Sequence, residues 1–319
     1  MLLVELGARV IKIEQPGIGD YYRAIPNTPL LLGDQVSVIN QDKESLGLDL
    51  KSPEGRKIFE KLLRGADVVL ESFRPGVLAK LGAGFARLKK IRPSIILCSI
   101  TGFGQKGPRA HLAGHDLNFL GLSGLAARIH DRSGGAVIPD FQVADLAAGY
   151  EAAMRIAAAL FERAKTRKGV HLDVTMDAAA LSMSRLYSGP TLLAGDLPCY
   201  GIYETADGQR MTLGALEPKF WSKFCRLIGQ PESVSREDLE TVFRSKTSAE
   251  WESLGEREDV CLFPMGVPSG QPPYPRAQNR PSRFLRAFPR LGGDTVSILK
   301  KLKYTSNQIR SLKERGVVA

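Results

Sequence analysis

The sequence has no long apolar run, no leader-like start and no clustered cysteines, and each absence excludes a class of protein. No stretch approaches the roughly 20 apolar residues that cross a bilayer. The opening M-L-L-V-E-L-G-A-R-V lacks the basic-then-apolar order of a signal peptide. The four cysteines stand far apart, without the paired spacing of a metal site. We therefore expect reduced thiols, no bound metal, no membrane partner and a cytoplasmic location.

The net charge of +10 is unevenly distributed along the 319 residues. Residues 271–319 carry 11 Lys and Arg against 2 Asp and Glu, so the rest of the chain is nearly neutral. We interpret this basic tail as a solvated, charge-rich face, with binding of a phosphate-rich ligand or a polyanion as the alternative. A nucleic-acid partner is not expected.

Apolar, β-branched runs alternate with helical patterns through the first half of the chain. Strands are expected near residues 8–14, 66–71, 94–100 and 170–176, and helices near residues 52–65, 77–90, 145–164 and from 177. Two further short strands are expected around the turn N-Q-D-K-E at residues 40–44. Continuous apolar strands separated by helices are typical of a parallel sheet. The sequence therefore predicts an α/β class with a Rossmann-like sheet.

The pattern changes near residue 200. The segments I-Y-E-T and Q-R-M-T-L-G-A-L flank A-D-G, which predicts a β-hairpin. We expect a large Rossmann-like domain over residues 1–187 and a small α+β domain over residues 188–265. Residues 266–319 are expected to form a linker and two helices that return to the large domain.

A series of motifs resembles, in order, the class III CoA-transferase family of the CaiB/BaiF type. They are G-A-R-V-I-K-I-E-Q-P-G, S-L-G-L-D-L-K-S-P-E-G, E-S-F-R-P-G-V, S-I-T-G-F-G-Q-K-G-P-R, A-G-H-D-L-N-F, V-A-D-L-A-A-G, K-G-V-H-L-D-V-T-M-D and Y-E-T-A-D-G. The resemblance implies an interlocked homodimer with active sites between the subunits. It also implies an acyl-CoA substrate and no cofactor beyond the coenzyme A of that substrate.

Within that family the sequence is most similar to the 2-methylacyl-CoA racemase branch. The resemblance implies that His115 and Asp145 exchange protons with the alpha carbon of a thioester, and that Glu204 lies near the histidine. On the residues alone, His115 is a loop histidine and Asp145 a helix N-cap, while Asp116 orients the loop or caps the helix that follows it. A proton alpha to a thioester needs a positioned base, which a histidine or a tuned carboxyl can supply.

The resemblance also places coenzyme A contacts in the first half of the chain, at Leu48, Lys51, Ser72, Phe73, Val77 and Lys80. Arg74 and Arg109 are candidate phosphate partners through charge-assisted hydrogen bonds. Each of these basic residues could equally be a solvated surface charge, and Phe73 could cover the adenine or close the end of a strand.

The sequence departs from the family pattern in three places. The family normally begins with a further strand and turn, so we expect a truncated chain whose neighbouring strands lose a partner. The segment at residues 265–274 is shorter than usual, and the turn at residues 40–44 is partly acidic. The alternatives to a racemase are therefore a CoA-transferase that forms an anhydride at Asp145, or a non-catalytic relative that binds coenzyme A.

Overall fold

The structure, a computed structural model, describes residues 1–20, 23, 39–131, 134–185, 197–266 and 289–319. They belong to two compact units, one made of Met1–Leu186 and Ser282–Ala319 and the other of Tyr187–Pro281. Across the described part of the chain, no helix combines the length and apolar character that a membrane span requires.

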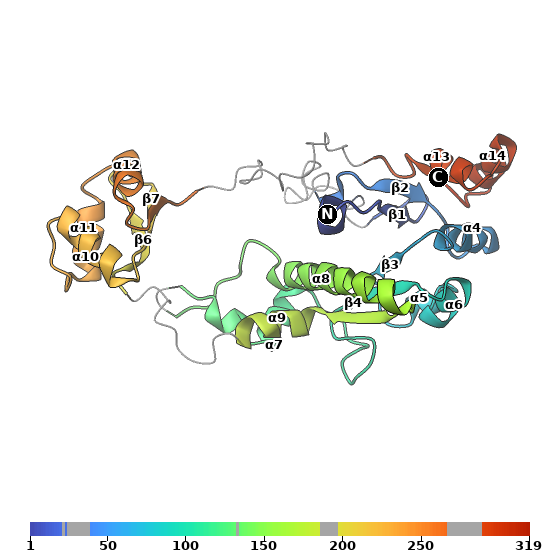
Figure 1. Ribbon diagram of the computed structural model, residues 1–319, viewed down its shortest axis with the longest axis horizontal. Coiled ribbons are helices and arrows are strands. Elements are labelled where there is room, and N and C mark those ends of the chain that lie inside the picture. The colour runs from blue at the N-terminus through green and yellow to red at the C-terminus, as the bar shows by residue number, and fades with distance from the viewer. Residues whose placement is uncertain (21–22, 24–38, 132–133, 186–196, 267–288) are drawn as a thin grey trace. The chain divides into compact units, whose positions relative to one another are not determined.

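Parallel strands build the first unit (Figure 1). Strand β1 (Ile11–Glu14) pairs with β2 (Glu44–Gly47). A second sheet has the order β3 (Val68–Glu71), β4 (Ile96–Thr101) and β5 (His171–Thr175). Neighbouring parallel strands must be joined by crossover connections, and the connections between β2 and β5 contain helices. The predicted mixed α/β fold with parallel sheets is therefore confirmed.

The helices of this unit begin and end where local chemistry dictates. They are α1 (Leu2–Glu5), α4 (Pro53–Leu63), α5 (Val77–Lys80), α6 (Phe85–Ile91), α7 (Asp116–Leu122), the 3₁₀ turn η2 (Ala126–Arg128), α8 (Val143–Thr166), α9 (Met176–Arg185), α13 (Thr295–Lys301) and α14 (Ser306–Glu314). At the start of α4, Ser52 Oγ accepts the amide of Gly55 at 2.9 Å and Pro53 occupies the first helical position. The cap expected from S-P-E-G is therefore present.

Two expected elements differ from the structure. The prediction of a single helix over residues 77–90 is wrong. Gly82 takes a left-handed φ of 80° and Gly84 is extended, so the segment forms two helices, α5 and α6. Of the two strands expected around N-Q-D-K-E, only β2 is found. Residues 39–40 are helical, and residues 36–38 lie outside the described part of the chain.

Helix α8 lies along the three-stranded sheet (Figure 1). The buried residues are Ala144, Ala148, Ala152, Ile156 and Ala159, spaced three or four apart along one face. Ala148, Ala152 and Ile156 pack with Cys98 of β4 and Val174 of β5. Because α8 runs into β5 as a crossover helix, its first turn lies at the carboxyl edge of the sheet.

The second unit is built on an antiparallel sheet of β6 (Tyr200–Glu204), β7 (Arg210–Gly214) and β8 (Leu262–Pro264). Its helices are α10 (Pro218–Leu227), α11 (Arg236–Phe243) and α12 (Ser248–Glu258). The hairpin expected around A-D-G is confirmed, since β6 and β7 pair across it. Tyr203 and Phe243 stack with ring centroids 4.4 Å apart inside a core that also contains Trp251.

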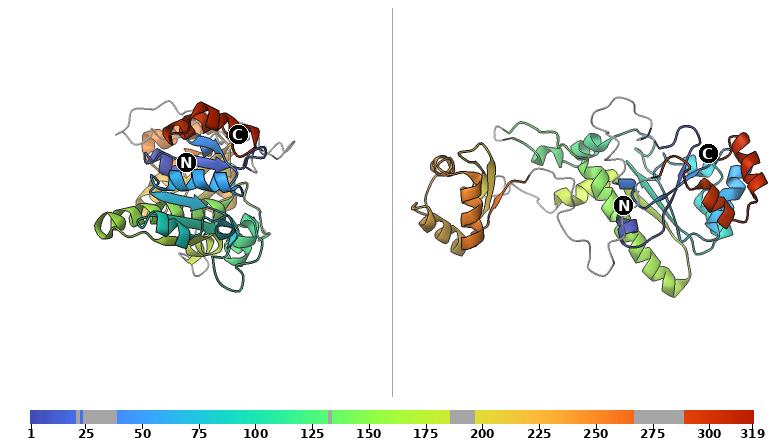
Figure 2. Two further views of the ribbon diagram at one scale, coloured as in Figure 1. Left: turned by 90° about the vertical axis from the view of Figure 1, so that its right-hand side faces the viewer. Right: turned by 90° about the horizontal axis from the view of Figure 1, so that it is seen from above.

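The C-terminal helices α13 and α14 pack against the first parallel pair, as Figure 2 shows for the red helices and the blue strands. Ile298, Leu299, Ile309 and Leu312 share one buried cluster with Leu46 of β2 and its neighbours. Residues distant in sequence therefore form one core around β1 and β2.

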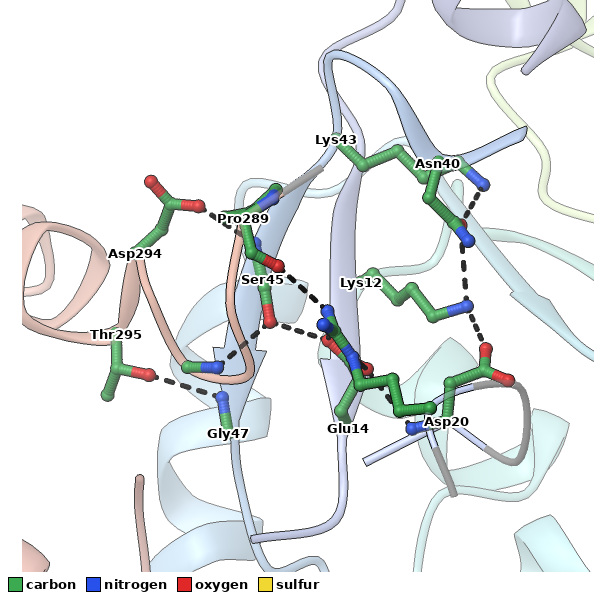
Figure 3. Close-up of polar contacts among 12 residues, drawn as sticks. Lys12, Glu14, Asp20, Asn40, Lys43, Ser45, Gly47, Pro289, Asp294 and Thr295 are labelled. Atoms are coloured by element: carbon green, nitrogen blue, oxygen red, sulfur yellow. Dashed lines mark hydrogen bonds and ion pairs between the residues drawn. The ribbon is translucent and has the colours of Figure 1, made fainter. Parts of the chain in front are cut away.

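A buried carboxylate at the end of β1 organises this region (Figure 3). The side chain of Glu14 is 1% exposed. It accepts hydrogen bonds from Ser45 Oγ at 2.5 Å, from Arg23 Nε at 2.7 Å and from the amide of Asp20 at 3.1 Å. A buried charge is stable only when it is paired and hydrogen-bonded, and Glu14 meets both conditions.

The same network holds the C-terminal segment against β2. Asp294 Oδ2 accepts the amide of Ser45 at 2.9 Å, and Thr295 Oγ1 accepts the amide of Gly47 at 3.1 Å (Figure 3). Ser45 Oγ also accepts the amide of Gly292 at 3.0 Å. These contacts satisfy polar groups along β2 with residues almost 250 positions away, so they fix the register of the C-terminal segment.

Replacing Glu14 with Gln should destabilise the protein by about 3 kcal/mol. This is the lower end for breaking a buried pair, because the Arg23 side chain remains 19% exposed. Equilibrium urea unfolding measures the change. The control is Glu60→Gln, which removes a partly exposed ion pair with Arg87 and should cost less than about 1 kcal/mol. Equal losses in the two variants would contradict a central role for Glu14.

Candidate active site

His115 is positioned by the start of α7. It is the N-cap residue, with an extended backbone at φ −122° and ψ 171°. Its amide donates to Asn118 Oδ1 at 3.0 Å, and its carbonyl accepts the amide of Asn118 at 2.8 Å. The backbone is therefore held from both sides, while the residue itself is exposed.

Phe119 anchors α7 at the carboxyl edge of the sheet. A Cβ at Gly102, just after β4, or at Gly114, just before His115, would lie 2.8 Å from the Phe119 ring. Both positions therefore need glycine for the ring to fit. Phe119 and Leu120 form a buried cluster with Ala144 of α8, which joins the starts of the two helices through their cores.

Asp145 is the third residue of α8, whose N-cap is Gln142, so the expectation that Asp145 is an N-cap is wrong. Its side chain is half-buried. The amide of Asp145 donates to Asp116 Oδ1 at 3.0 Å. Asp116 is 8% exposed and belongs to the first turn of α7. Asp116 therefore caps a helix, but that helix is α8, at a residue 29 positions further along the chain, and the expectation that it caps the helix following it directly is wrong.

The electrostatics around Asp145 suit proton transfer. Burial raises the pKa of Asp145 above its ordinary value of 3.8, the neighbouring Asp116 carboxylate raises it further, and His115 lowers it. The hydrogen bond from the Asp145 amide to Asp116, the residue after His115, joins the two helix starts that bear these predicted residues. A carboxyl whose pKa is raised by burial and a neighbouring charge, beside a histidine, is typical of acid–base sites.

The loop after β4 has the spacing G-x-G-x-x-G at residues 102–107. Gly104 N donates to Thr101 Oγ1 at 3.0 Å, and Gln105 N donates to Asp173 Oδ2 at 2.9 Å. A dinucleotide site needs such a loop to open a helix, and here turns follow until α7. The loop instead leads to Arg109, which is exposed.

Most of the predicted coenzyme A residues lie near the carboxyl end of β3. Ser72, Phe73 and Arg74 follow β3 directly and are exposed, with Phe73 at 42%. Val77 and Lys80 are the first and last residues of α5. This is the edge at which open α/β sheets bind ligands. The contacts themselves stay predictions.

The two remaining residues precede α4. Lys51 is exposed, and its amide donates to Asp49 Oδ1 at 2.9 Å. Leu48 is 2% exposed and packs in the core beneath the C-terminal helices. Its side chain is therefore committed to the core, and only its backbone could meet a ligand.

Glu204 belongs to the second unit. It ends β6 opposite Arg210, its side chain is 54% exposed, and Arg244 Nε lies 4.0 Å from its carboxylate. Glu204 therefore lies at the end of the hairpin strand that precedes the A-D-G turn. Its predicted position near His115 stays a prediction.

Replacing Asp116 with Asn should lower the pKa of Asp145 while keeping the helix cap. The amide oxygen can still accept from the Asp145 backbone, but the charge that raises the pKa is removed. The value should remain above the ordinary one, because burial is the larger cause. A ¹³C NMR titration of the Asp145 carboxyl measures the shift. Asp140→Asn, an exposed change five residues away, is the control and should leave the titration in place.

Comparisons with known proteins show the family of the chain. The model of CoA-transferase family III matches residues 1–271. Human alpha-methylacyl-CoA racemase is 34% identical over 290 residues, covering 83% of this chain and 72% of the relative. Acetyl-CoA:oxalate CoA-transferase of Acetobacter aceti is 41% identical over 245 residues, covering 72% of this chain and 62% of the relative.

Among solved structures, a CaiB/BaiF family protein from Brucella suis superposes with a TM-score of 0.76 at 25% sequence identity. The match covers 94% of this chain and 93% of that protein. The family model covers more than half of the chain, and the similarity in structure extends over nearly all of it. The chain is therefore an enzyme of CoA-transferase family III.

Proposed function

We propose that the chain is an acyl-CoA racemase or epimerase that inverts the alpha carbon of a 2-methylacyl-CoA thioester. The observation that carries the proposal is that Asp116 joins the helix starts that bear His115 and Asp145, and that burial and Asp116 raise the pKa of the Asp145 carboxyl. The two residues come from separate helix starts at the carboxyl edge of the sheet. The 34% identity to human alpha-methylacyl-CoA racemase supports the same activity.

The proposed reaction moves two protons and breaks no other bond. One of the two groups removes the alpha proton from one face of the substrate, and the C–H electron pair passes into an enolate. The other group returns a proton to the opposite face, which inverts the centre. A positioned acid or base of this kind contributes about 10²–10⁴-fold to the rate.

The enolate oxygen needs donors, which the start of α8 can supply. Asp116 already accepts the amide of Asp145. Helix geometry leaves the amides of Val143 and Ala144 without an intrahelical acceptor. Their N–H groups and the positive end of the helix dipole would stabilise negative charge on the oxygen.

The coenzyme A part of the substrate would lie along the carboxyl edge of the sheet. Arg74 and Lys80 are exposed near the end of β3, and Arg109 is exposed at the end of the loop after β4. These cations suit the phosphates of coenzyme A. Glu204 would complete the site from the small domain of a partner subunit, which requires a homodimer.

A 2-methylacyl-CoA incubated with the protein in heavy water should exchange its alpha hydrogen for deuterium, as mass spectrometry would show. His115→Ala and Asp145→Asn should each slow exchange by about 10²–10⁴-fold. His111→Ala changes another exposed histidine four residues from His115 and should exchange at the wild-type rate. A dimeric protein that binds coenzyme A but catalyses no exchange would refute the proposal.

Asp145→Asn also separates catalysis from stability. The pKa of Asp145 is raised in the folded state, so its ionised form costs stability. That cost is absent at pH values below the ordinary pKa and grows as the pH rises through the folded one. Asp145→Asn should therefore melt no lower than wild type at pH 7, with the difference vanishing near pH 3. A lower melting temperature at pH 7 would indicate a structural role.

A second candidate is CoA transfer through an anhydride at Asp145, favoured by the 41% identity to an acetyl-CoA:oxalate CoA-transferase. The Asp145 carboxylate would attack the thioester carbonyl, forming the acyl anhydride as the thiolate of coenzyme A leaves. The thiolate would then attack the aspartyl carbonyl, which releases the first carboxylate and leaves an aspartyl-CoA thioester. The acceptor carboxylate would attack that thioester to form a second anhydride as the thiolate leaves. Attack of the thiolate on the acceptor's carbonyl would then give the new acyl-CoA and restore the Asp145 carboxylate.

Hydroxylamine distinguishes the two reactions. If Asp145 is acylated, incubation with an acyl-CoA and hydroxylamine should convert it to a hydroxamate that peptide mass spectrometry detects. His115→Ala should then retain transfer, because the anhydride route uses only the carboxylate. A racemase should form no such adduct and should depend on both residues.

A further inference from the structure

An arginine-lined cavity of about 360 Å³ lies at the amino-terminal edge of the three-stranded sheet. Asp67 directly precedes β3, Ser94 lies just before β4, and the other lining comes from Arg92 and from the end of α8. The lining residues are Asp67, Arg92, Ser94, Leu160, Arg163, Ala164 and Arg167. None of them belongs to the candidate active site. Five residue steps along β3 separate Asp67 from Ser72, or roughly 15 Å of extended chain.

The cavity carries an excess of positive charge. It is lined by three arginines and by one acid, Asp67. Arg92 Nη2 and Arg163 Nη2 both approach Asp67 Oδ1, at 3.2 and 3.0 Å, so two guanidinium groups share one carboxylate. The C-terminal end of a helix contributes roughly half a negative charge. Even with that contribution, the net charge of the residues that line the cavity is positive.

Backbone contacts fix the arginines in place. Arg163 Nη1 donates to the carbonyls of Asp67 and Ser94 at 3.2 and 3.4 Å. Arg92 Nη1 donates to the carbonyl of Arg64 at 2.6 Å. Two loops thus hold two guanidinium groups side by side, which is the preorganisation that a bound anion requires.

Donors remain after these contacts are made. The Nε of Arg92 is shielded from solvent and has no hydrogen-bond acceptor among the described residues. Arg167 lines the cavity, and the structure gives its side chain no hydrogen bond or ion pair within the described ranges. Its backbone is the left-handed C-cap of α8, at φ 58°. Planar guanidinium groups with spare donors suit a tetrahedral oxyanion.

We propose that this cavity binds a phosphoryl group, either as inorganic phosphate or as the phosphate monoester of a larger ligand. The anion would accept from Arg167 and from the donors left on Arg92 and Arg163. It would lie apart from the predicted coenzyme A contacts, because those follow β3 and the cavity precedes it. The proposal does not depend on whether the active site is a racemase or a transferase.

The test is a calorimetric titration of the full chain with inorganic phosphate at constant ionic strength. Arg167→Gly removes the guanidinium and keeps the cap, because glycine adopts the left-handed backbone without strain. Its affinity for phosphate should fall by about tenfold or more, the usual value of a charged hydrogen bond. The matched control, Lys168→Gln, removes an exposed cation next in sequence that does not line the cavity, and should bind as wild type does.

Three outcomes would overturn the proposal. The first is a wild-type protein that does not bind phosphate. The second is an equal loss of phosphate affinity in Lys168→Gln, which would indicate diffuse electrostatic attraction. The third is loss of the phosphate signal in saturating coenzyme A, which would place the ion in the coenzyme A site. A parallel titration with glycerol phosphate identifies the source of the group. Binding of phosphate alone supports a free ion, and binding of both supports the phosphate of a larger ligand.

Discussion

The candidate site depends on one hydrogen bond, from the amide of Asp145 to the carboxylate of Asp116. It joins the first turns of α7 and α8, which are 29 residues apart in sequence. The bond satisfies an amide that helix geometry leaves open, and it also brings a second negative charge toward Asp145. The contact that secures the helix therefore also raises the pKa of the carboxyl beside it. Structural and chemical roles of Asp116 cannot be separated by simple truncation.

Small residues give this bond its rigid support. The alanines of α8 allow its axis to approach β4 and β5 closely, and glycines at 102 and 114 leave room for the ring of Phe119 of α7. Parallel strands deliver all these segments to one edge, because their connecting loops meet there. Helix α8, which bears the aspartate, also shares a packed cluster with Val68 of β3, the strand that leads to most of the predicted coenzyme A residues. The site is assembled by packing, and hydrogen bonds set its final geometry.

Local chemistry was predictable from the sequence, and distant pairing was not. The cap at Ser52 and the hairpin at residues 200–214 follow from short motifs whose physics is complete within a few residues. The break at Gly82 was missed because a glycine in a helical pattern can be tolerated, and only its left-handed backbone ends the helix. A D-L-A-A pattern does not distinguish an N-cap from the third helical residue. The N-cap of α8 was therefore predicted at Asp145, three positions after the observed N-cap, Gln142. The arginine-lined cavity is formed by three segments that are separate in sequence, so no local motif predicts it.

The raised pKa of Asp145 has a specific meaning for a two-base reaction. In such a reaction one of the two groups takes a proton from carbon, and a carboxylate of higher pKa is the stronger base. Burial raises the pKa of Asp145 and the Asp116 carboxylate raises it further, so both increase the basicity of its ionised form. A nucleophilic aspartate also acts in its ionised form, and a higher pKa strengthens a carboxylate as a nucleophile as well as a base. The environment of Asp145 therefore suits chemistry at a thioester by either route, and the role of His115 is what separates proton exchange from acylation.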